Sequence, residues 1–567
     1  MLPATPSLRL PAPSARRLAI AALVLVAAVP VAFVVGLLVA SSRNIVFWDE
    51  FDSAIALMLR LDAGLGSREF LSHIFSVTNE HRTVTSRLMF AASWWLTGSV
   101  NFHVIGAIGN AFFFGLIGLL LWAVRTTTRR VRLAVLLAFL FVQLEHFENF
   151  FWSGASVDHF QVVALVAGTI IGLARGSRGG LLVAAVCALL ATFTLAHGVL
   201  AWPVGAAMLA SAGRRRDLAL WGGFTLVALG LFLTGYQLNP GHRIGDVSLA
   251  GLARTGHYWL TLIGAPATLG EARLAPLPGA ALLLGLGWLG ARGAWRREPV
   301  AMPLAVFAVA ALGLVAFGRV DVASAQVLSR YMVLGGLAWS LAAFMALERL
   351  SDRRRPFRLL AWCLPALGLF NVAANARFLN DAETFVEARE RAASRYKQHR
   401  EDGRGLFRLH PLPGHADELL TQAAQRGIYE LPRFCFAQHI PVTEPSTRLV
   451  SHIDEITANQ HAAFLDGWAV IPGRISRRGE IHVVLRNEHA FHVFNTLTIR
   501  RPDVASAHAV PGFRLSGFRF VMSRARLPVG EFEIGLLIRH GDHGEYVMTG
   551  RRLDLREPAP PQLAKGG

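Results

Sequence analysis

Only three cysteines occur in the 567 residues of this chain. Cys187 and Cys363 lie in apolar runs, so no disulfide framework is expected. The sequence also lacks a P-loop, a glycine-rich loop that would cradle a nucleotide, and the HExxH or CxxC spacing of zinc sites. These absences argue against a nucleotide-dependent reaction and against a metal site of familiar spacing. No cofactor is predicted, although the many histidines and carboxylates leave a divalent cation open.

Charge is scarce as well. Charged residues make up 17% of the chain and hydrophobic residues 53%, with a mean hydropathy of +0.42. A soluble protein of this length carries more charge than that. Runs of about 20 apolar residues, enough to span a bilayer, recur up to about residue 374 and then stop. The sequence therefore predicts an α-helical polytopic membrane domain over 1–375, a helical linker region over 376–447 and an extracytoplasmic, sandwich-like β-domain over 448–557.

About eleven apolar stretches are candidates for transmembrane helices. They lie near 18–40, 101–124, 133–148, 155–174, 180–196, 198–211, 218–236, 277–292, 301–317, 331–348 and 359–374. The pair around His197-Gly198 is also consistent with one broken helix. Arg16-Arg17 before the first run resembles the start of a signal peptide, but no clear cleavage site follows, so a retained anchor is predicted.

Basic residues cluster at every second connection between these stretches. The clusters are Arg16-Arg17, Arg125/Arg129/Arg130/Arg132, Arg175/Arg178, Arg214-Arg215-Arg216, Arg292/Arg296/Arg297 and Arg353-Arg354-Arg355. Cytoplasmic loops are enriched in Lys and Arg, so the N-terminus is predicted to be cytoplasmic. The segments 41–100, 145–154, 237–276 and 318–330, and the chain from about 375, are then outward. Because the same topology explains the net charge of +18, no nucleic-acid partner is predicted.

The outward segments carry the carboxylates and histidines, so a working site is expected on the outer face. In "NIVFWDEFDSAIALML", Asp49, Glu50 and Asp52 follow the first apolar run, with Trp48 and Phe51 between them. The interleaved aromatics indicate a half-buried turn, and an ordinary solvated turn that helps to fix topology is the alternative. Apolar residues at helical spacing over 51–64 and 70–98 predict two helices lying along the membrane interface.

Ionisable residues in the other outward segments are further candidates, because charge at membrane depth is costly and usually faces a cavity or a partner. The substrate-binding candidates are Glu80, His81, Arg82, Glu148, His159, Arg330 and Tyr331, and Glu145, Asp158 and His197 are also considered. Structural alternatives stay open. Arg330-Tyr331 suits a snorkelling anchor with its aromatic belt partner, and histidines often serve as structural hydrogen-bonding groups.

Together these features resemble the GT-C superfamily of polytopic glycosyltransferases. The resemblance rests on an acidic "WDEFD" after the first span, two interfacial helices, about eleven spans and an extracytoplasmic C-terminal domain. The stretches "NEHR" (79–82), "ENFFW" (148–152) and "SRY" (329–331) look similar to stretches in bacterial members. The resemblance covers roughly residues 15–375. It implies a multi-pass protein of the bacterial inner membrane that transfers a sugar, with inversion, from a polyprenyl-phosphate-linked donor to a glycan or lipid acceptor on the outer face.

The implied chemistry gives roles to the outward residues. Transfer needs a base to take the proton of the acceptor hydroxyl, and we assign Asp49 to that role, with Glu50 and Asp52 as helpers. The leaving phosphate needs cations, and arginine binds phosphate with a planar fork. Arg82 and Arg330 are therefore the predicted phosphate partners. No motif identifies the sugar or the acceptor.

From about residue 448 the pattern changes to short alternating segments, such as "EIHVVLRN" and "GEFEIGLLIR", separated by Gly, Pro and Asn. This pattern predicts an antiparallel β-sandwich. "LDGWAVIPG" together with "SGFRFVM" looks like a small β-domain attached to bacterial glycan-processing enzymes. Carbohydrate binding, a partner contact and a passive lid are the open alternatives for this domain.

Two other classes of function compete with the glycosyltransferase. A transporter or flippase for a glycolipid should have polar residues in mid-span and internal repeats, whereas these spans are mostly Ala, Leu, Val, Gly and Phe and no repeat is evident. A non-catalytic membrane scaffold that presents the β-domain would leave the outward acids and Arg330 unexplained. The glycosyltransferase is therefore the leading hypothesis.

Overall fold

The chain forms two compact units. The computed structural model describes residues 15–77, 81–236, 248–323, 327–351, 357–398, 406–432, 442–459, 462–477, 479–524, 527–540 and 543–556. The helical unit comprises Met1–Arg43 and Arg60–Glu383, and the C-terminal unit comprises Asn44–Leu59 and Thr384–Gly567. Part of the first predicted outward segment therefore belongs with residues more than three hundred positions later in the chain.

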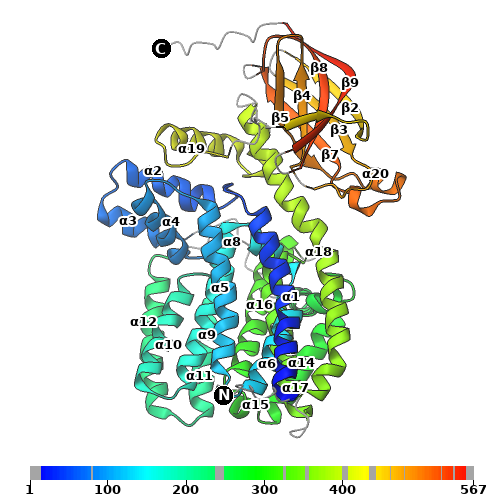
Figure 1. Cartoon of the computed structure of the whole chain (residues 1–567). Helices are drawn as coiled ribbons and strands as arrows, with labels where there is room; N and C mark the ends of the chain where they lie inside the picture. The colour runs from blue at the N-terminus through cyan, green and yellow to red at the C-terminus, as the bar shows by residue number, and fades with distance from the viewer. Residues whose placement is uncertain are drawn as a thin grey trace, which may run out of the picture. The chain divides into compact units, whose positions relative to one another are not determined.

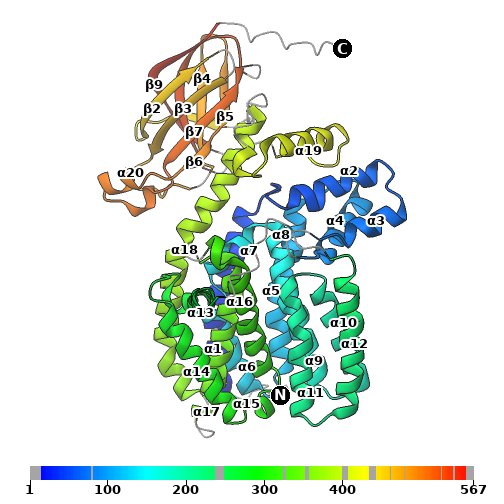
Figure 2. The same cartoon turned by 180° about the vertical axis from the view of Figure 1, so that it is seen from behind.

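The helical unit consists of a long series of helices. They are α1 (Ala15–Ser41), α3 (Ser67–Ile74), α4 (Val84–Thr97), α5 (Phe102–Ala123), α6 (Thr127–Leu140), α7 (Phe147–Phe151), α8 (Ser153–Ala155), α9 (Gln161–Ala174), α10 (Arg178–Thr192), α11 (Ala201–Ser211), α12 (Arg215–Leu233), α13 (Leu249–Gly264), α14 (Pro276–Ala291), α15 (Ala294–Arg297), α16 (Ala301–Ala323), α17 (Ser329–Leu350) and α18 (Arg358–Gln398) as far as Glu383. Figures 1 and 2 show α5, α9, α10 and α12 side by side in this bundle.

Seven helices in the described part of the chain are long and apolar enough to cross a membrane. They cover Arg17–Ser41, Phe102–Ala123, Ser153–Ala174, Arg215–Leu233, Ala301–Val320, Ser329–Leu350 and Arg358–Glu390. Shorter apolar helices cover Arg178–Thr192, Ala196–Ser211 and Pro276–Ala291. The expected coarse fold, mainly helical with a C-terminal β-sheet region, is confirmed. The count of eleven crossings stays a prediction.

Polar residues occupy the N-cap positions of several of these helices. Asn101 accepts hydrogen bonds from the backbone N–H groups of His103 and Val104 at the start of α5. Thr126, Ser177 and Ser248 cap α6, α10 and α13 in the same way. Such caps satisfy N–H groups that have no partner inside the helix. The sequence therefore marks these boundaries with polar residues between apolar runs.

Burial separates inner from outer helices. Inside the bundle, 78% of the Ser153–Ala174 window and 72% of the Ser329–Leu350 window are buried, against 11% for Arg215–Leu233. The outer helix α12 exposes Leu226, Val227 and Leu233. Soluble proteins seldom expose apolar surface of this extent. The exposed apolar face of α12 is therefore suited to contact with lipid.

The predicted span near 133–148 is not one helix. Helix α6 ends at Leu140, and a short 3-10 turn, η2 (Leu144–His146), leads into α7. Two asparagines of α18 bind the backbone at this break. The Asn371 amide donates to the Phe139 carbonyl at 3.0 Å, and the Asn375 amide oxygen accepts from the Leu144 N–H at 2.9 Å. Irregular backbone among apolar helices needs such partners.

Helix α13 lies where the sequence predicts an outward connection, over 237–276. Residues such as Arg254 and His257 interrupt its apolar pattern, so hydropathy does not reveal it. It packs closely on α14, since a Cβ added at Gly264 would lie 1.9 Å from the Ala275 carbonyl oxygen. Close backbone contact of this kind requires glycine, and the length of an apolar run gives no sign of it.

The helical part of the C-terminal unit includes the end of α18, the π-helical turn η1 (Phe51–Ala56) and α19 (Pro413–Gln425). Backbone groups of residues 44–59 bond to the later segment. The Val46 N–H donates to the Tyr429 hydroxyl at 3.0 Å, and the Trp48 N–H donates to the Leu409 carbonyl at 2.7 Å. The sequence predicts the end of the first domain at residue 375, where the apolar pattern ends, but α18 continues through this position. The boundary between the two compact units follows Glu383, eight residues later.

Two β-sheets form the rest of the C-terminal unit. The strands are β1 (Val442–Pro445), β2 (Val450–Ala458), β3 (Ala462–Val470), β4 (Ile481–Arg486), β5 (Phe491–Asn495), β6 (Leu497–Ile499), β7 (Gly517–Ser523), β8 (Gly530–His540) and β9 (His543–Leu555). Their orders are β1-β9-β8-β4-β5 and β2-β3-β7-β6. Leu465 and Phe520 of one sheet share a buried core with Val483 and Leu536 of the other. Strand β1, which pairs parallel to β9, precedes the predicted boundary at 448.

The stability of the β-sandwich is expected to fall at acidic pH because of His482. Burial in β4 lowers the pKa of this histidine from 6.5 to about 4. Below pH 6.5 the imidazole of His482 binds a proton in the unfolded chain but stays neutral in the folded domain. The free energy of unfolding therefore falls as the pH falls below 6.5. This loss reaches about 3 kcal/mol at pH 4. Thermal melts of residues 440–556 between pH 7 and pH 4 should record it, and His482→Leu should flatten the dependence. An unchanged pH dependence in that variant would contradict the prediction.

Candidate functional site

The stretch "ENFFW" and the first turn of α17 hold each other in place. The Arg330 N–H donates to the Glu148 carboxylate at 3.0 Å, so Glu148 caps the N-terminus of α17. The Asn149 amide donates to the Arg330 carbonyl at 2.9 Å, and the Ser329 hydroxyl donates to the Glu145 carbonyl at 2.6 Å. Two motifs about 180 residues apart thus form one structure, called here the Glu148–Arg330 cluster.

The Arg330 side chain remains partly exposed in this cluster. Its Nη1 lies 3.6 Å from Glu148 Oε1, and its guanidinium lies 5.3 Å from the Tyr331 ring centroid and 6.0 Å from that of Trp152. A carboxylate on one side and aromatic rings on two others restrict its position. The side chain is 25% exposed, which leaves part of the planar fork accessible to an anionic group.

Two histidines extend the cluster inward. The His159 ring lies edge-on to Tyr331, with centroids 5.7 Å apart, and stacks on His197 at 6.3 Å. Both rings are buried. His159 belongs to the π-helical turn η3 (Ser156–Phe160), and π-helical turns occur frequently at functional sites. His197 lies in the 3-10 turn η4 (Ala196–Leu200) between α10 and α11.

Residue His81 approaches the same region from the segment before α4. Its Nδ1 accepts the Ala196 N–H at 3.2 Å, beside His197. In the first turn of α4, the Ser86 hydroxyl donates to the Asp158 carboxylate at 2.7 Å. These contacts join "NEHR" and the start of α4 to η3 and η4. Glu80, the other acid predicted in this motif, lies outside the described residues.

Arg82 and Arg87 are bonded mainly to backbone. Arg82 donates to the carbonyls of Phe75 at 2.6 Å and Thr234 at 2.5 Å. Arg87 donates to the carbonyls of His73, Ile74 and Ser76 around the end of α3. Burial lowers the pKa of Arg82 and brings the pKa of Arg87 to about 10. These contacts favour structural roles for both, and phosphate binding by Arg82 stays a prediction with less geometric support.

A second candidate, the acidic turn of residues 47–50, lies in the C-terminal unit. The Glu50 carboxylate is buried and accepts the Phe47 N–H at 2.7 Å, which closes the turn. At its tip Trp48 has φ of +50°, a conformation that is strained for a bulky side chain. Strained residues cluster at functional sites. Trp48 and Asp49 are both exposed, so the turn displays an aromatic ring beside a carboxylate.

Asp52 follows this turn within η1 and pairs with histidine. Its Oδ1 lies 2.8 Å from His415 Nε2, and its Oδ2 lies 3.7 Å from His410 Nε2. Sequence reasoning missed both histidines, because "LHPLPGH" has no spacing characteristic of a site. Within the described ranges, no group of three or more His, Cys, Asp or Glu residues is arranged to hold a metal ion.

Apart from Arg82, which binds backbone carbonyls, the described residues among the predicted ones fall into two groups. Glu148, His159, Arg330 and Tyr331 meet in the helical unit, and His81 bonds to η4 next to their partner His197. Asp49, Glu50 and Asp52 lie together in the C-terminal unit. Asn149 and Ser329, which complete the Glu148–Arg330 cluster, were not among the predicted site residues. Their signal was their position inside the motifs "ENFFW" and "SRY".

Comparison with known proteins gives no relative. No protein-family model, no curated protein and no solved structure matches the chain.

Proposed function

We propose that this protein is a lipid-phosphate-sugar-dependent glycosyltransferase of a bacterial inner membrane. The donor is a sugar linked to polyprenyl phosphate, and the acceptor is a cell-surface glycan or lipid on the outer side. The observation that supports this best is the Glu148–Arg330 cluster, in which a partly exposed arginine side chain lies near two aromatic rings at the first turn of an apolar helix. Such a group suits the phosphate of a lipid carrier at the membrane surface.

The proposed reaction is a single displacement. Asp49 takes the proton of the acceptor hydroxyl, whose oxygen attacks the anomeric carbon of the donor sugar. The bond between that carbon and the phosphate oxygen breaks with inversion, and the carrier phosphate leaves as an anion. Arg330 stabilises the charge that develops on the phosphate. Asp52, paired with His415, assists near the base, while Glu50 maintains the turn that displays Asp49.

Membrane topology gives a first check of this proposal. In a variant without native cysteines, single cysteines placed within 41–100 or 450–556 are expected to react with an impermeant thiol reagent in cells with a permeabilised outer membrane. Cysteines at 125–132 or 350–351 should react only after the inner membrane is opened. The reason is the basic clusters, which resist translocation. Protection of 450–556 in cells with only the outer membrane permeabilised would remove the candidate residues from the outer face.

The direct test compares cell-surface glycans and glycolipids by mass spectrometry in cells with and without the protein. Loss of one sugar residue from a defined glycan, with its lipid-linked donor accumulating, is the expected result. Restoration by the wild-type protein and not by a variant of Asp49 would connect the change to the proposed base. Loss of a whole surface glycan, with the complete lipid-linked glycan retained on the inner leaflet, would favour the transporter instead.

A further inference from the structure

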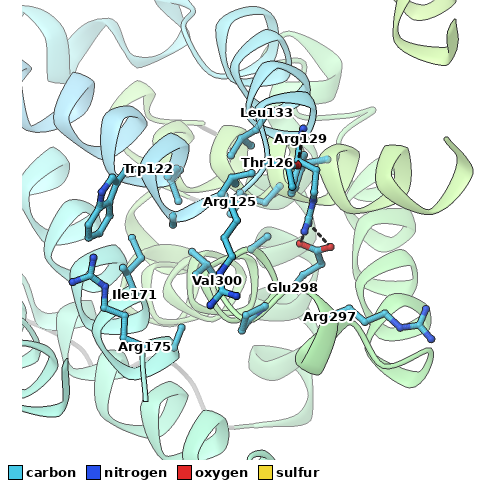
Figure 3. A pocket seen from close by; sticks show the side chains of 18 of the residues that line it. Trp122, Arg125, Thr126, Arg129, Leu133, Ile171, Arg175, Arg297, Glu298 and Val300 are labelled. Atoms are coloured by element: carbon cyan, nitrogen blue, oxygen red, sulfur yellow. Dashed lines mark hydrogen bonds and ion pairs between the residues drawn. The ribbon is translucent and has the colours of Figure 1, made fainter. Parts of the chain in front are cut away.

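Five arginines from three separate connections line one cavity of the helical unit (Figure 3). Its volume is about 640 Å³. Arg125 lies between α5 and α6, Arg129 on α6, Arg175 at the end of α9, and Arg296 and Arg297 on α15. Glu298 is the acidic residue among the described side chains that line it. This basic cavity has no part in the proposed reaction.

The single acid of the lining is already paired with one of the arginines. Glu298 lies 2.6 Å from Arg129 Nη2, and Arg129 Nε also lies 2.9 Å from Glu348 of α17. By contrast, Arg125 and Arg175 have no carboxylate partner among the described residues. The basic cavity therefore keeps an excess of positive charge, and a concave site of one sign attracts counter-ions.

Arg125 and Arg175 line different parts of the basic cavity. Figure 3 shows Arg125 extending into the middle of the cavity, while Arg175 approaches the ring of Trp122 and Arg297 points away. The Arg175 guanidinium lies 4.0 Å from the Trp122 ring centroid. Stacking on a flat ring fixes the plane of the guanidinium and leaves its edge free to donate hydrogen bonds.

Membrane topology alone does not require this arrangement. The preference for basic cytoplasmic loops is met by arginines anywhere in those loops, as it is by Arg215 and Arg216 at the start of α12, which do not line the basic cavity. Here arginines of different loops converge on one cavity, whose wall also includes the N-terminal ends of α6 and α16. Helix N-termini add partial positive charge at an anion site.

We propose that the basic cavity binds a phosphate-ester anion, supplied by the headgroup of an anionic membrane lipid. The arginine forks match phosphate oxygens, and the volume falls within the range of about 300–1,000 Å³ usual for ligand sites. Trp122, in the last turn of the candidate span α5, is 54% exposed, so acyl chains can pass along an apolar helix end. Basic cavities between membrane helices bind anionic headgroups in this way.

Native mass spectrometry of the purified full-length protein tests this proposal. Phosphatidylglycerol and phosphatidylcholine are titrated against the wild type, the double variant Arg125→Gln/Arg175→Gln and the control Arg216→Gln. The wild type and the control should bind phosphatidylglycerol in preference to phosphatidylcholine. The double variant should bind it roughly thirty-fold more weakly, because each arginine near an anionic lipid contributes about a five-fold factor. The same lipid should raise the melting temperature of the wild type and not that of the double variant.

Further arms distinguish the source of the anion. If inorganic phosphate alone raises the melting temperature of the wild type and not that of the double variant, the anion site is supported and soluble phosphate is its source. Wild-type affinity for phosphatidylglycerol in the double variant, or equal weakening in Arg216→Gln, would overturn the proposal. Should the double variant fail to fold, Arg125→Lys/Arg175→Lys is measured in its place, because it keeps both charges and lacks the planar forks. This variant should bind phosphatidylglycerol with an affinity between those of the wild type and the control on one side and a roughly thirty-fold loss on the other. Wild-type affinity in the lysine variant would overturn the role of the forks.

Discussion

Replacing Arg330 by alanine is expected to lower the rate of sugar transfer by roughly 100- to 1,000-fold, the usual effect of removing one group that stabilises developing charge. The guanidinium is held by Glu148 and two aromatic rings while part of it stays exposed. Arg330→Lys should retain more activity, because the charge survives and the planar fork does not. The measurement is transfer from a defined polyprenyl-phosphate sugar by purified protein in detergent.

The matched control is Arg273→Ala, which removes an exposed arginine of the same unit in the connection before α14. It should transfer sugar at the wild-type rate. Melting curves separate catalysis from folding, because Glu148 caps α17 through the backbone N–H of residue 330, which the alanine variant keeps. Normal transfer by folded Arg330→Ala would exclude this arginine as the phosphate partner.

Asp49→Asn is expected to reduce transfer by about 100- to 10,000-fold, the range typical for loss of a general base. Asparagine has nearly the same size and cannot accept the proton. The protein should still insert and accumulate, because Asp49 is exposed and the turn is closed by the Glu50 carboxylate. Binding of the donor should change little, so the loss should appear in kcat rather than in KM.

Glu69→Gln is the control for this change, since Glu69 is an exposed acid within the same predicted segment, residues 41–100. Near-normal transfer by Asp49→Asn would exclude Asp49 as the base. Asp52→Asn would then be the next variant to measure, because Asp52 is partly exposed and Glu50 is buried within its own turn. Normal transfer by both variants and by the double variant would exclude the proposed mechanism.

Hydropathy predicted the helices whose apolar runs are long and uninterrupted. Helices α5 and α17 lie within a few residues of the predicted spans, and Gly64, with φ of +86°, follows the end of the helix predicted over 51–64. Hydropathy failed where contacts between distant residues, rather than the length of an apolar run, decide where a helix forms or ends. Helix α13 depends on the close approach of Gly264 to Ala275, and the break after Leu140 depends on Asn371 and Asn375, more than 200 residues away.

The sequence predicted individual residues of the candidate site but not which residues contact one another. The motifs pointed to Glu148, Arg330 and Tyr331 because charge near apolar spans is costly, and the structure joins Glu148 to Arg330. Nothing local in the sequence predicts that Asp52 pairs with His415 or that Arg82 binds two backbone carbonyls. Such partners lie from seven to more than 360 residues apart in sequence, and only the fold specifies them.

The placement of residues 44–59 in the C-terminal unit has a consequence for the order of events during synthesis. The hydrogen bond between Val46 and Tyr429 joins positions 383 residues apart. At about 5–20 residues per second, a ribosome needs roughly 20–80 s to cover that distance. The acidic turn is therefore synthesised long before its partners, and it lacks them until nearly the whole helical unit has been translated. A nascent chain released before about residue 430 would carry Asp49 and still lack the framework that displays it.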